Sequence, residues 1–286
     1  MITNVSCAQN FNANFSKYFE AKDTLNQRKT LEKWEKAKPT DPELFTSYFN
    51  YYFLKSREEV MTLSTQEPQS DALVIKDSLD NTAGYISSEI NYKNKIFQKG
   101  IDKIEKGIQL YPNRLDMRFG EIYVLGQVKD WNNFTKKIIQ AIRYSVVNKN
   151  EWTWTNNEKK EDGENFFLGG LQDYQLQLYN TEDDKLLTNM ADIATEVLKL
   201  YPNHVESLSN LSITYMLKND FEKAIEVLLR AEKINPKDYI VLSNVAHAYK
   251  QKGDKLKAIE YYEKTVKYGD KNAIEDAKKQ IEKLKK

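Results

Sequence analysis

The sequence predicts an all-α protein made of repeated antiparallel helix hairpins, and three observations support this fold class. Charged residues make up 30% of the 286 residues, and Gly and Pro number only 10 and 6, so the composition favours helices over turns. The segment Leu-Tyr-Pro-Asn occurs twice, at 110–113 and 200–203, each time after a helix-forming run. A 34-residue spacing separates Pro202 from Pro236, which indicates a repeated unit.

The C-terminal part of the chain repeats with this 34-residue period. Residues 205–236 align with 239–270 without a gap. The alignment places Leu208 on Leu242, Leu211 on Val245, Tyr215 on Tyr249, Ala224 on Ala258 and Leu228 on Tyr262. In each unit a polar stretch, KNDFEKA or KGDKLKA, separates two apolar helical stripes. This pattern predicts a helix, a tight turn and an antiparallel helix.

Small and bulky side chains alternate along this repeat as close helix packing requires. Ala224 and Ala258 let two helices approach, while Tyr215 and Tyr249 fill the space beside them. The pattern resembles the tetratricopeptide repeat, and its positions are occupied by Leu208, Leu211, Ser212, Tyr215, Ala224, Leu228, Ala231 and Pro236, then by Leu242, Val245, Ala246, Tyr249, Ala258 and Tyr262. Asp270 stands where the second Pro is expected. The resemblance implies a right-handed superhelix, or solenoid, of helix hairpins.

The period predicts the organisation of the C-terminal two thirds of the chain. Residues 204–270 form the two clear repeats, and 271–286 form a helix that caps the last apolar face. Residues 112–203 read as divergent units of the same kind. The interval from Pro112 to Pro202 is not a multiple of the period, and the excess falls in a polar inserted loop at 147–165.

The N-terminal third is expected to form divergent helical hairpins over residues 10–111. Asp41 can cap a helix over 42–58, and Pro42 suits its first turn. A loop that contains the short apolar run ALVI is expected next, followed by a helix from Tyr85 to Leu110.

Residues 1–9 are expected to be a disordered N-terminus or the remnant of a signal peptide. Ser6, Cys7 and Ala8 have the small side chains that precede a signal cleavage site, but no basic or apolar stretch comes before them. As written, the chain is expected to be cytoplasmic. The alternative is an exported protein, periplasmic or associated with the envelope, if residues 1–8 end a longer signal peptide.

The composition argues against several function classes. The formal net charge is +1, so there is no overall field for nucleic acid, and no apolar run approaches the roughly 18 residues of a membrane span. A single cysteine excludes a multi-cysteine metal site. No phosphate loop or nucleophile motif is present, and neither His204 nor His247 has a partner at a ligand spacing. We therefore expect no catalytic residues, no cofactor and no metal.

Protein binding fits the repeats better than catalysis. The resemblance implies that the first helix of each repeat lines a concave groove. By helical period the groove residues are Glu206, Ser209, Asn210, Ile213, Ile240, Ser243, Asn244 and His247. Asn210 and Asn244 recur at the 34-residue spacing, and their amides can hold the backbone of a peptide. The alternative is that these amides only make contacts between helices.

Two further pairs of residues each have a structural and a functional interpretation. Trp152 and Trp154 alternate in the loop, so they form either a stacking platform for a ligand or anchors that fix the loop to its own fold. Arg114 and Arg118 share a helix face and could grip an anion, although surface ion pairs are the expected arrangement.

The sequence therefore predicts a noncatalytic scaffold that binds a peptide or helix of a protein partner. The identity of the partner and the oligomeric state do not follow from the residues. One alternative is a structural subunit or homodimer that buries the N-terminal hairpins in a cell-envelope complex. Another is an enzyme with a site near Trp152 and Trp154.

Overall fold

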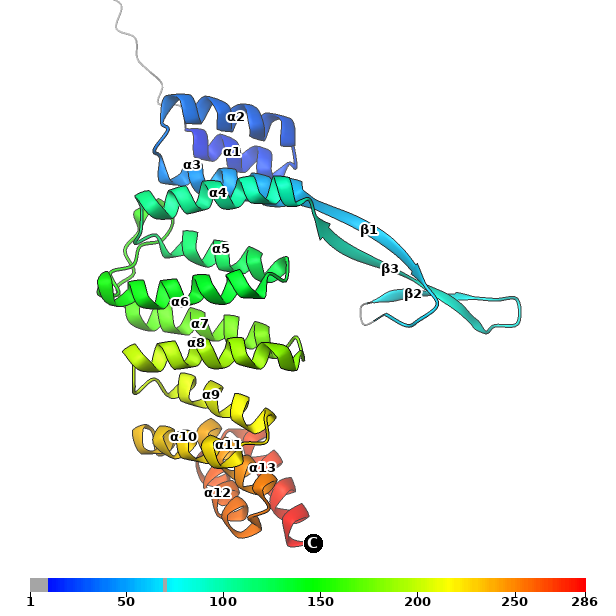
Figure 1. Cartoon of the computed structure of the whole chain (residues 1–286), viewed down its shortest axis with the longest axis vertical. Coiled ribbons are helices and arrows are strands. Elements are labelled where there is room, and N and C mark those ends of the chain that lie inside the picture. Colours follow the sequence, from blue (N-terminus) through cyan, green and yellow to red (C-terminus); the bar gives the residue numbers. More distant parts are fainter. Residues whose placement is uncertain (1–9, 69–70) are drawn as a thin grey trace, which may run out of the picture. The chain divides into compact units, whose positions relative to one another are not determined.

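A computed structural model describes residues 10–68 and 71–286 of the chain (Figure 1). The expectation for residues 1–9 lies outside this described part. The chain divides into two units. Unit 1 runs to Lys129 and also includes residues 152–160, whereas unit 2 comprises 130–151 and 161–286. Both are built of antiparallel helix pairs, which confirms the predicted fold class.

Unit 1 holds five α-helices among its described residues, and their bounds are α1 Phe11–Glu20, α2 Thr24–Ala37, α3 Pro42–Ser56, α4 Asn94–Leu110 and α5 Leu115–Gln127. The start of α3 confirms the prediction, because Asp41 caps it by accepting the N–H of Glu43 and Pro42 lies in its first turn. Aromatic side chains fill the core around α1, α2 and α3. Phe11 stacks on Trp34 with ring centroids 5.9 Å apart, and the Trp34 indole N–H donates to Asp41.

Helices α3 and α4 pack closely because α4 presents glycine to α3. A Cβ atom at Gly107 would lie 2.9 Å from the Cβ of Phe45, and one at Gly100 would lie 3.2 Å from the Cβ of Tyr52. A Cβ contact of 2.9 Å, as at Gly107, is shorter than real Cβ atoms show. The two helix backbones therefore approach at Gly107 to a distance that no larger residue allows.

A three-stranded antiparallel sheet lies between α3 and α4 in the sequence. Its strands are β1 Arg57–Ser64, β2 Ala72–Lys76 and β3 Thr82–Tyr92, in the order β1-β3-β2. The prediction of a loop followed by a helix from Tyr85 was wrong. Residues 85–92 are strand, and α4 begins only at Asn94. The alternation of Met61 and Leu63 on β1 with polar neighbours has the period of a strand, and the short β2–β3 turn is closed by Asp77.

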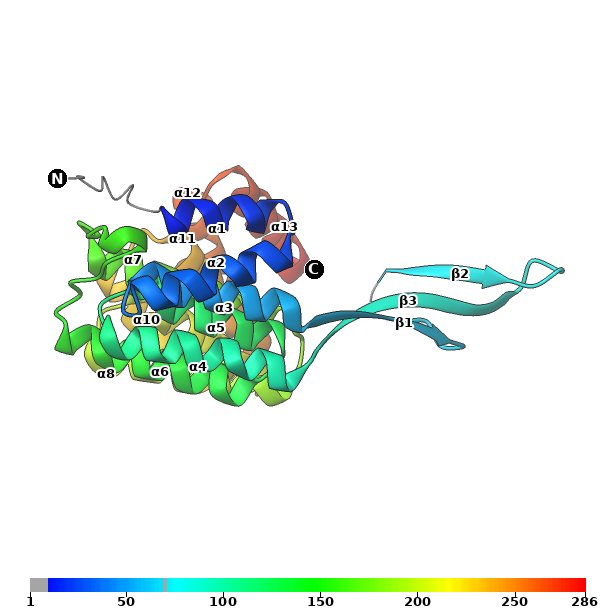
Figure 2. The same ribbon diagram turned by 90° about the horizontal axis from the view of Figure 1, so that it is seen from above.

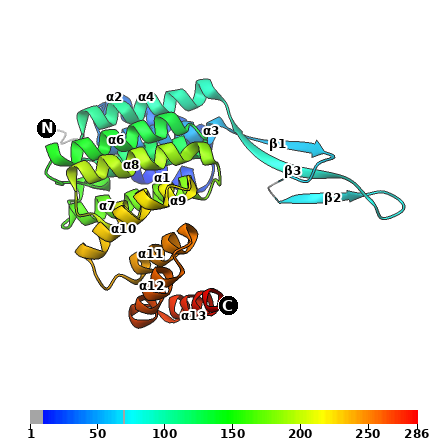
Figure 3. The ribbon, with the colours of Figure 1, turned by 60° about the horizontal axis from the view of Figure 1, so that its bottom comes forward.

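Unit 2 holds the remaining described helices: α6 Trp131–Val147, α7 Gly163–Tyr179, α8 Leu187–Leu200, α9 Val205–Leu217, α10 Phe221–Ile234, α11 Tyr239–Lys252, α12 Lys255–Tyr268 and α13 Lys271–Lys285. The pairs α9–α10 and α11–α12 follow the 34-residue period. Asp220 and Asp254, which are one period apart, cap α10 and α12. Ala224 and Ala258 are fully buried between the paired helices. Figure 3 shows α11, α12 and α13 side by side.

The two Leu-Tyr-Pro-Asn segments end α4 and α8 at their leucines. The N–H of Tyr111 closes α4 by donating to Gly107, and the N–H of Tyr201 closes α8 by donating to Val197. The asparagines do not cap the helices that follow. Those cap positions are held by Arg114 and His204, and neither side chain makes a capping hydrogen bond.

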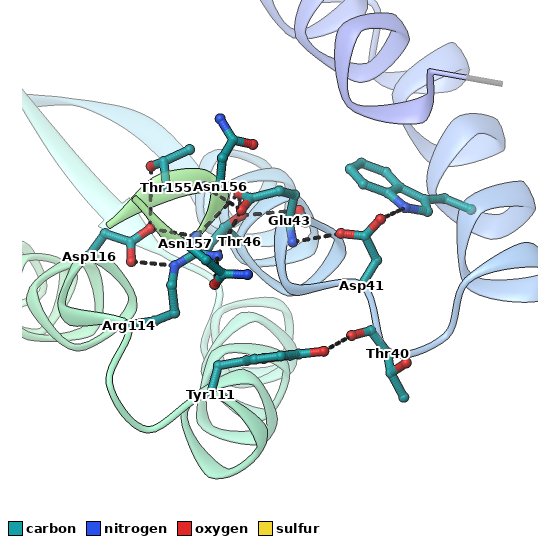
Figure 4. A network of polar contacts seen from close by, with 11 residues as sticks. Thr40, Asp41, Glu43, Thr46, Tyr111, Arg114, Asp116, Thr155, Asn156 and Asn157 are labelled. Carbon is teal, nitrogen blue, oxygen red and sulfur yellow. Dashed lines mark hydrogen bonds and ion pairs between the residues drawn. The ribbon is translucent and has the colours of Figure 1, made fainter. Parts of the chain in front are cut away.

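Arg114 is the centre of a buried ion cluster in unit 1 (Figure 4). The expectation of surface ion pairs was wrong here, since its side chain is only 1% exposed. The Arg114 guanidinium donates to Glu43 at 2.7 Å and twice to Asp116 at 2.8 Å. Burial disfavours the charged guanidinium, but hydrogen bonds to Asp116 and Glu43 outweigh it and raise the pKa of Arg114. Arg118 lies beside the cluster and donates to the carbonyl of Pro112.

The ion cluster also positions the loop at residues 152–160. The N–H of Asn156 donates to Glu43 at 2.8 Å. Backbone bonds from Thr153 to Asn113 and from Leu115 to Thr153 hold the same loop against the start of α5. One cation and two carboxylates would be unfavourable in a dry interior, but the loop adds one donor to each carboxylate: the N–H of Asn156 to Glu43 and the hydroxyl of Thr155 to Asp116. The loop is therefore part of the packing of unit 1.

We expect Gly107→Ala to lower the free energy of unfolding by about 1–3 kcal/mol, because the new methyl group overpacks the contact between α3 and α4. Gly169→Ala is the matched control. Gly169 also lies inside a helix but has nothing within 4 Å of the added Cβ, so alanine should stabilise by about 0.5–1 kcal/mol. Urea unfolding followed by circular dichroism measures both. Equal changes in the two variants would contradict the close approach.

We expect Arg114→Met to lower the free energy of unfolding by about 3–5 kcal/mol, because it leaves Glu43 and Asp116 buried without their cation. Arg114→Lys should recover only part of this loss, since an ammonium lacks the forked donors that reach both carboxylates. Arg28→Met is the control, because Arg28 pairs with Glu32 in full solvent and its loss should not change the unfolding curve. An Arg114→Lys variant as stable as the native chain would refute the need for bidentate geometry.

Candidate functional site

The predicted groove residues lie on α9 and α11 of unit 2, and most of them are accessible. Glu206, Ile240 and His247 are exposed. The half-buried members are Asn210, Ile213, Ser243 and Asn244. Ser209 is only 9% exposed, so its side chain is not accessible to a ligand. The accessible members belong to one face of each helix, on the side opposite the buried Leu208 and Leu242.

Asn210 makes a contact between helices, which is one of the two roles that its position suggested. Its amide nitrogen donates to the Gln172 side-chain oxygen on α7 at 2.7 Å. The bond leaves the carbonyl oxygen and the second N–H of Asn210, and both N–H donors of Gln172, for a ligand. Both interpretations of Asn210 are thus compatible, since a contact between helices uses only part of its hydrogen-bonding capacity.

Asn244 is the second amide of the predicted groove. It is half-buried on α11, and no other side chain or backbone group in the described part of the chain is hydrogen-bonded to its amide. An amide that is partly withdrawn from water gains from a ligand that supplies both a donor and an acceptor. We call Gln172, Asn210 and Asn244 the amide row.

Exposed apolar side chains accompany the amide row on the first helices of the hairpins. Leu176 and Tyr179 on α7 are 55% and 48% exposed, Leu217 on α9 is 48% exposed and Ile240 on α11 is 56% exposed. Sequence reasoning identified Ile240 but missed Gln172, Leu176 and Tyr179. Gln172 and Asn210 are 38 residues apart, which departs from the 34-residue period. The period therefore did not predict that residues of α7 belong to the same face.

A hollow of about 460 Å³ opens at one end of this face, beside the turn between α7 and α8. Leu187 and Met190 contribute apolar surface, and Tyr179 and Leu217 stand at its edge. Carboxylates lie on the turn that borders it, at Glu182, Asp183 and Asp184. Over α7, this turn and α9, the acidic side chains outnumber the basic ones, and Lys185 is the single lysine or arginine in residues 163–186 and 204–217. The field near the hollow is negative.

The two histidines of unit 2 are neutral at physiological pH. Burial lowers the pKa of His247, and the positive charge of Lys250 lowers it further. Burial lowers the pKa of His204, and nearby Glu206 and Glu164 oppose this shift only in part. His204 bonds to Ser207, and His247 contacts Gln251. His247 is therefore available as an uncharged hydrogen-bonding group, whereas both ring nitrogens of His204 already contact Ser207 and Glu206.

Trp152 and Trp154 do not form an exposed stacking platform. The Trp152 side chain is fully buried, and Trp154 is half-buried with its ring edge-on to Phe119 at 6.4 Å between centroids. The Lys160 ammonium lies 5.5 Å from the centre of the Trp154 ring. These contacts belong to the packing of the loop, which leaves no open aromatic surface for a ligand.

Unit 1 contains a hollow of about 430 Å³ that the sequence analysis did not anticipate. Phe15, Phe49 and Ile104 form its buried floor, and polar side chains such as Asn12 and Asn50 stand around it. Its two innermost carboxylates, those of Glu43 and Asp116, already pair with Arg114. The charged groups nearest Arg114 are therefore already paired, and the polar lining that remains includes Asn12 and Asn50.

The described residues run from 10 to 68 and from 71 to 286. Within these ranges, no three side chains of His, Cys, Asp or Glu gather as a metal ion would need. No helix of the described chain combines the length and apolarity of a transmembrane segment.

Solved structures similar to this chain include several tetratricopeptide repeat proteins. YrrB, described as such a protein with an unusual peptide-binding site, is 14% identical over 87% of this chain and 97% of its own, with a TM-score of 0.43. The Sgt2 repeat domain from Aspergillus fumigatus is 24% identical over 40% of this chain and 76% of its own, with a TM-score of 0.35. A thermophilic protein of Thermus thermophilus is 14% identical over 67% and 91%, with a TM-score of 0.39. Similarity at this level carries no information about function.

Family models match the C-terminal part of the chain directly. A model described as "TPR repeat" matches residues 213–253, and one described as "Tetratricopeptide repeat" matches 241–272. No curated protein matches the chain. The matched residues run from the last turn of α9 to the start of α13 and include α10 to α12, where the Asp caps and buried alanines follow the 34-residue period. The chain therefore contains tetratricopeptide repeats over residues 213–272.

Proposed function

We propose that unit 2 binds a segment of a protein partner along α7, α9 and α11. Tetratricopeptide repeats place the chain among protein interaction scaffolds in general. The observation that carries the finer proposal is the amide row of Gln172, Asn210 and Asn244 beside exposed apolar side chains. Amides bind the backbone of any segment, and apolar surfaces bind its side chains.

The faces of the helices differ in a way that supports this assignment. On the second helices, the exposed large apolar residues lie near the helix ends, as Ile234 and Leu256 do. Their charged side chains already pair with one another, for example Lys257 with Glu260 and Lys264 with Glu232. On the first helices Tyr179, Leu217 and Ile240 also lie near the ends. Leu176, which is exposed, and Ile213, which is half-buried, lie within the length of a first helix. A partner therefore has more to gain from the first helices.

The charge around the hollow indicates the chemistry of the partner segment. Acidic residues surround an apolar depression, so the proposed ligand carries an apolar anchor flanked by lysine or arginine. Leu217 and Met190 would contact the anchor, and Glu182 and Asp183 would attract the basic residues. No catalytic step enters this proposal.

We expect peptides selected from a random display library on the full chain to be rich in basic and apolar residues. Asn244→Ala combined with Leu176→Lys should weaken their binding about tenfold to a hundredfold, because it removes a hydrogen-bonding amide and puts a cation on the proposed apolar contact. Fluorescence anisotropy with labelled peptides measures the affinity. Glu263→Ala, on the exposed side of α12, is the control and should leave binding unchanged. Selected peptides that bind the double variant and the control equally well would rule out this groove.

A further inference from the structure

The three-stranded sheet of residues 57–92, which we call the arm, has two chemically different faces. Cross-strand partners share a face, so Leu63, Ile86 and Leu73 form a row across all three strands. The same face carries the apolar side chains Met61, Ile75 and Ile90, and we call it the apolar face. The opposite face, which we call the polar face, carries Glu58, Thr62, Ser87 and Glu89 together with Val60 and Val74.

The helices of unit 1 do not cover the apolar face. Figures 1 and 2 show the arm leaving the ends of α3 and α4 and extending away from the helices of unit 1. Met61, Leu63 and Leu73 are 72%, 71% and 72% exposed, and Ile90 is 46% exposed. An antiparallel sheet of this kind ordinarily buries its apolar face, and a small sheet needs such packing to be stable. Contiguous apolar surface of this kind marks an interaction site.

The size of the apolar face fits a second copy of the same face. From these exposed fractions it presents roughly 500 Å² per copy, so a face-to-face pair buries about 1,000 Å², which is near the lower limit for a specific interface. Two identical pleated faces related by a two-fold axis can pack as two layers do in a β-sandwich. The pairing uses each apolar face once and therefore closes at two copies.

The charges of the arm are placed so that such a pair buries few of them. The arm carries seven acidic and two basic residues, but only Arg57 and Glu59 share the apolar face. Glu59 there accepts a hydrogen bond from Ser88. The other acidic residues lie on the polar face or in the turns, where they stay hydrated when two apolar faces meet. Buried unpaired charge, which would oppose association, is thus avoided.

The same charges disfavour an anionic membrane as the occupant. The exposed Leu79 at the turn between β2 and β3 is flanked by Asp77 and Asp80, and anionic lipid would repel both carboxylates. We propose that two copies of this chain associate through the apolar faces of their arms. The pairing is separate from peptide binding by unit 2.

Sedimentation equilibrium of the full chain tests this pairing from about 1 µM to about 300 µM, a range suited to an interface of this small size. We expect a reversible monomer–dimer equilibrium. Leu63→Lys with Leu73→Lys should weaken the dimer at least about 100-fold, because four cations would be buried in its interface.

Thr62→Lys with Val74→Lys is the matched control. These residues adjoin Leu63 and Leu73 in the same strands, and the double variant adds two lysines as well, but on the polar face. We expect it to keep the dimer. Circular dichroism and thermal melting should show that both double variants stay folded, since the side chains at all four positions are exposed. A chain that is monomeric throughout, or a dimer on which the two variants have equal effects, would overturn the proposal.

Discussion

Close approach of paired helices at small side chains is the constraint on which the hairpins of both units depend. In unit 1 this point is Gly107, where a Cβ atom would lie 2.9 Å from Phe45. In unit 2 the equivalent positions are the fully buried Ala224 and Ala258. Larger side chains there would separate the helices and open the adjoining core. Because these contacts bury one stripe of every helix, they also decide which stripe of α9 and α11 is left for a ligand.

The repeats were predictable because their signals are local and periodic. Asp caps, buried alanines and tyrosines recur at a fixed spacing, so a single pair of aligned segments identifies them. The arm was not predicted, and Ile86 and Ile90 show why. A spacing of four residues places side chains on one face of a helix and also on one face of a strand. The true helix begins after Tyr92, so the apolar pattern continued from strand into helix without a change in spacing.

The face proposed for binding was predictable only in part, because some of its contacts join residues that are distant in sequence. The period identified Asn210 and Asn244, but the bond from Asn210 to Gln172 spans 38 residues and leaves the 34-residue register. Arg114 shows the same limit more strongly. Its place on a helix face with Arg118 suggested surface pairs, whereas its burial depends on Glu43, which is 71 residues away, and on the loop at 152–160.

An uncovered sheet also has unpaired strand edges, and the placement of charge on the arm bears on how far its association can proceed. β1 and β2 each have one edge without a neighbouring strand, and such edges invite further pairing between chains. Carboxylates at Glu58 and Glu89 on the polar face and at Asp77 in the turn would come close together in any larger stack. These carboxylates would repel one another in such a stack. In a single pair of apolar faces they stay apart and hydrated. The charge pattern thus permits a closed pair and opposes an open series of sheets.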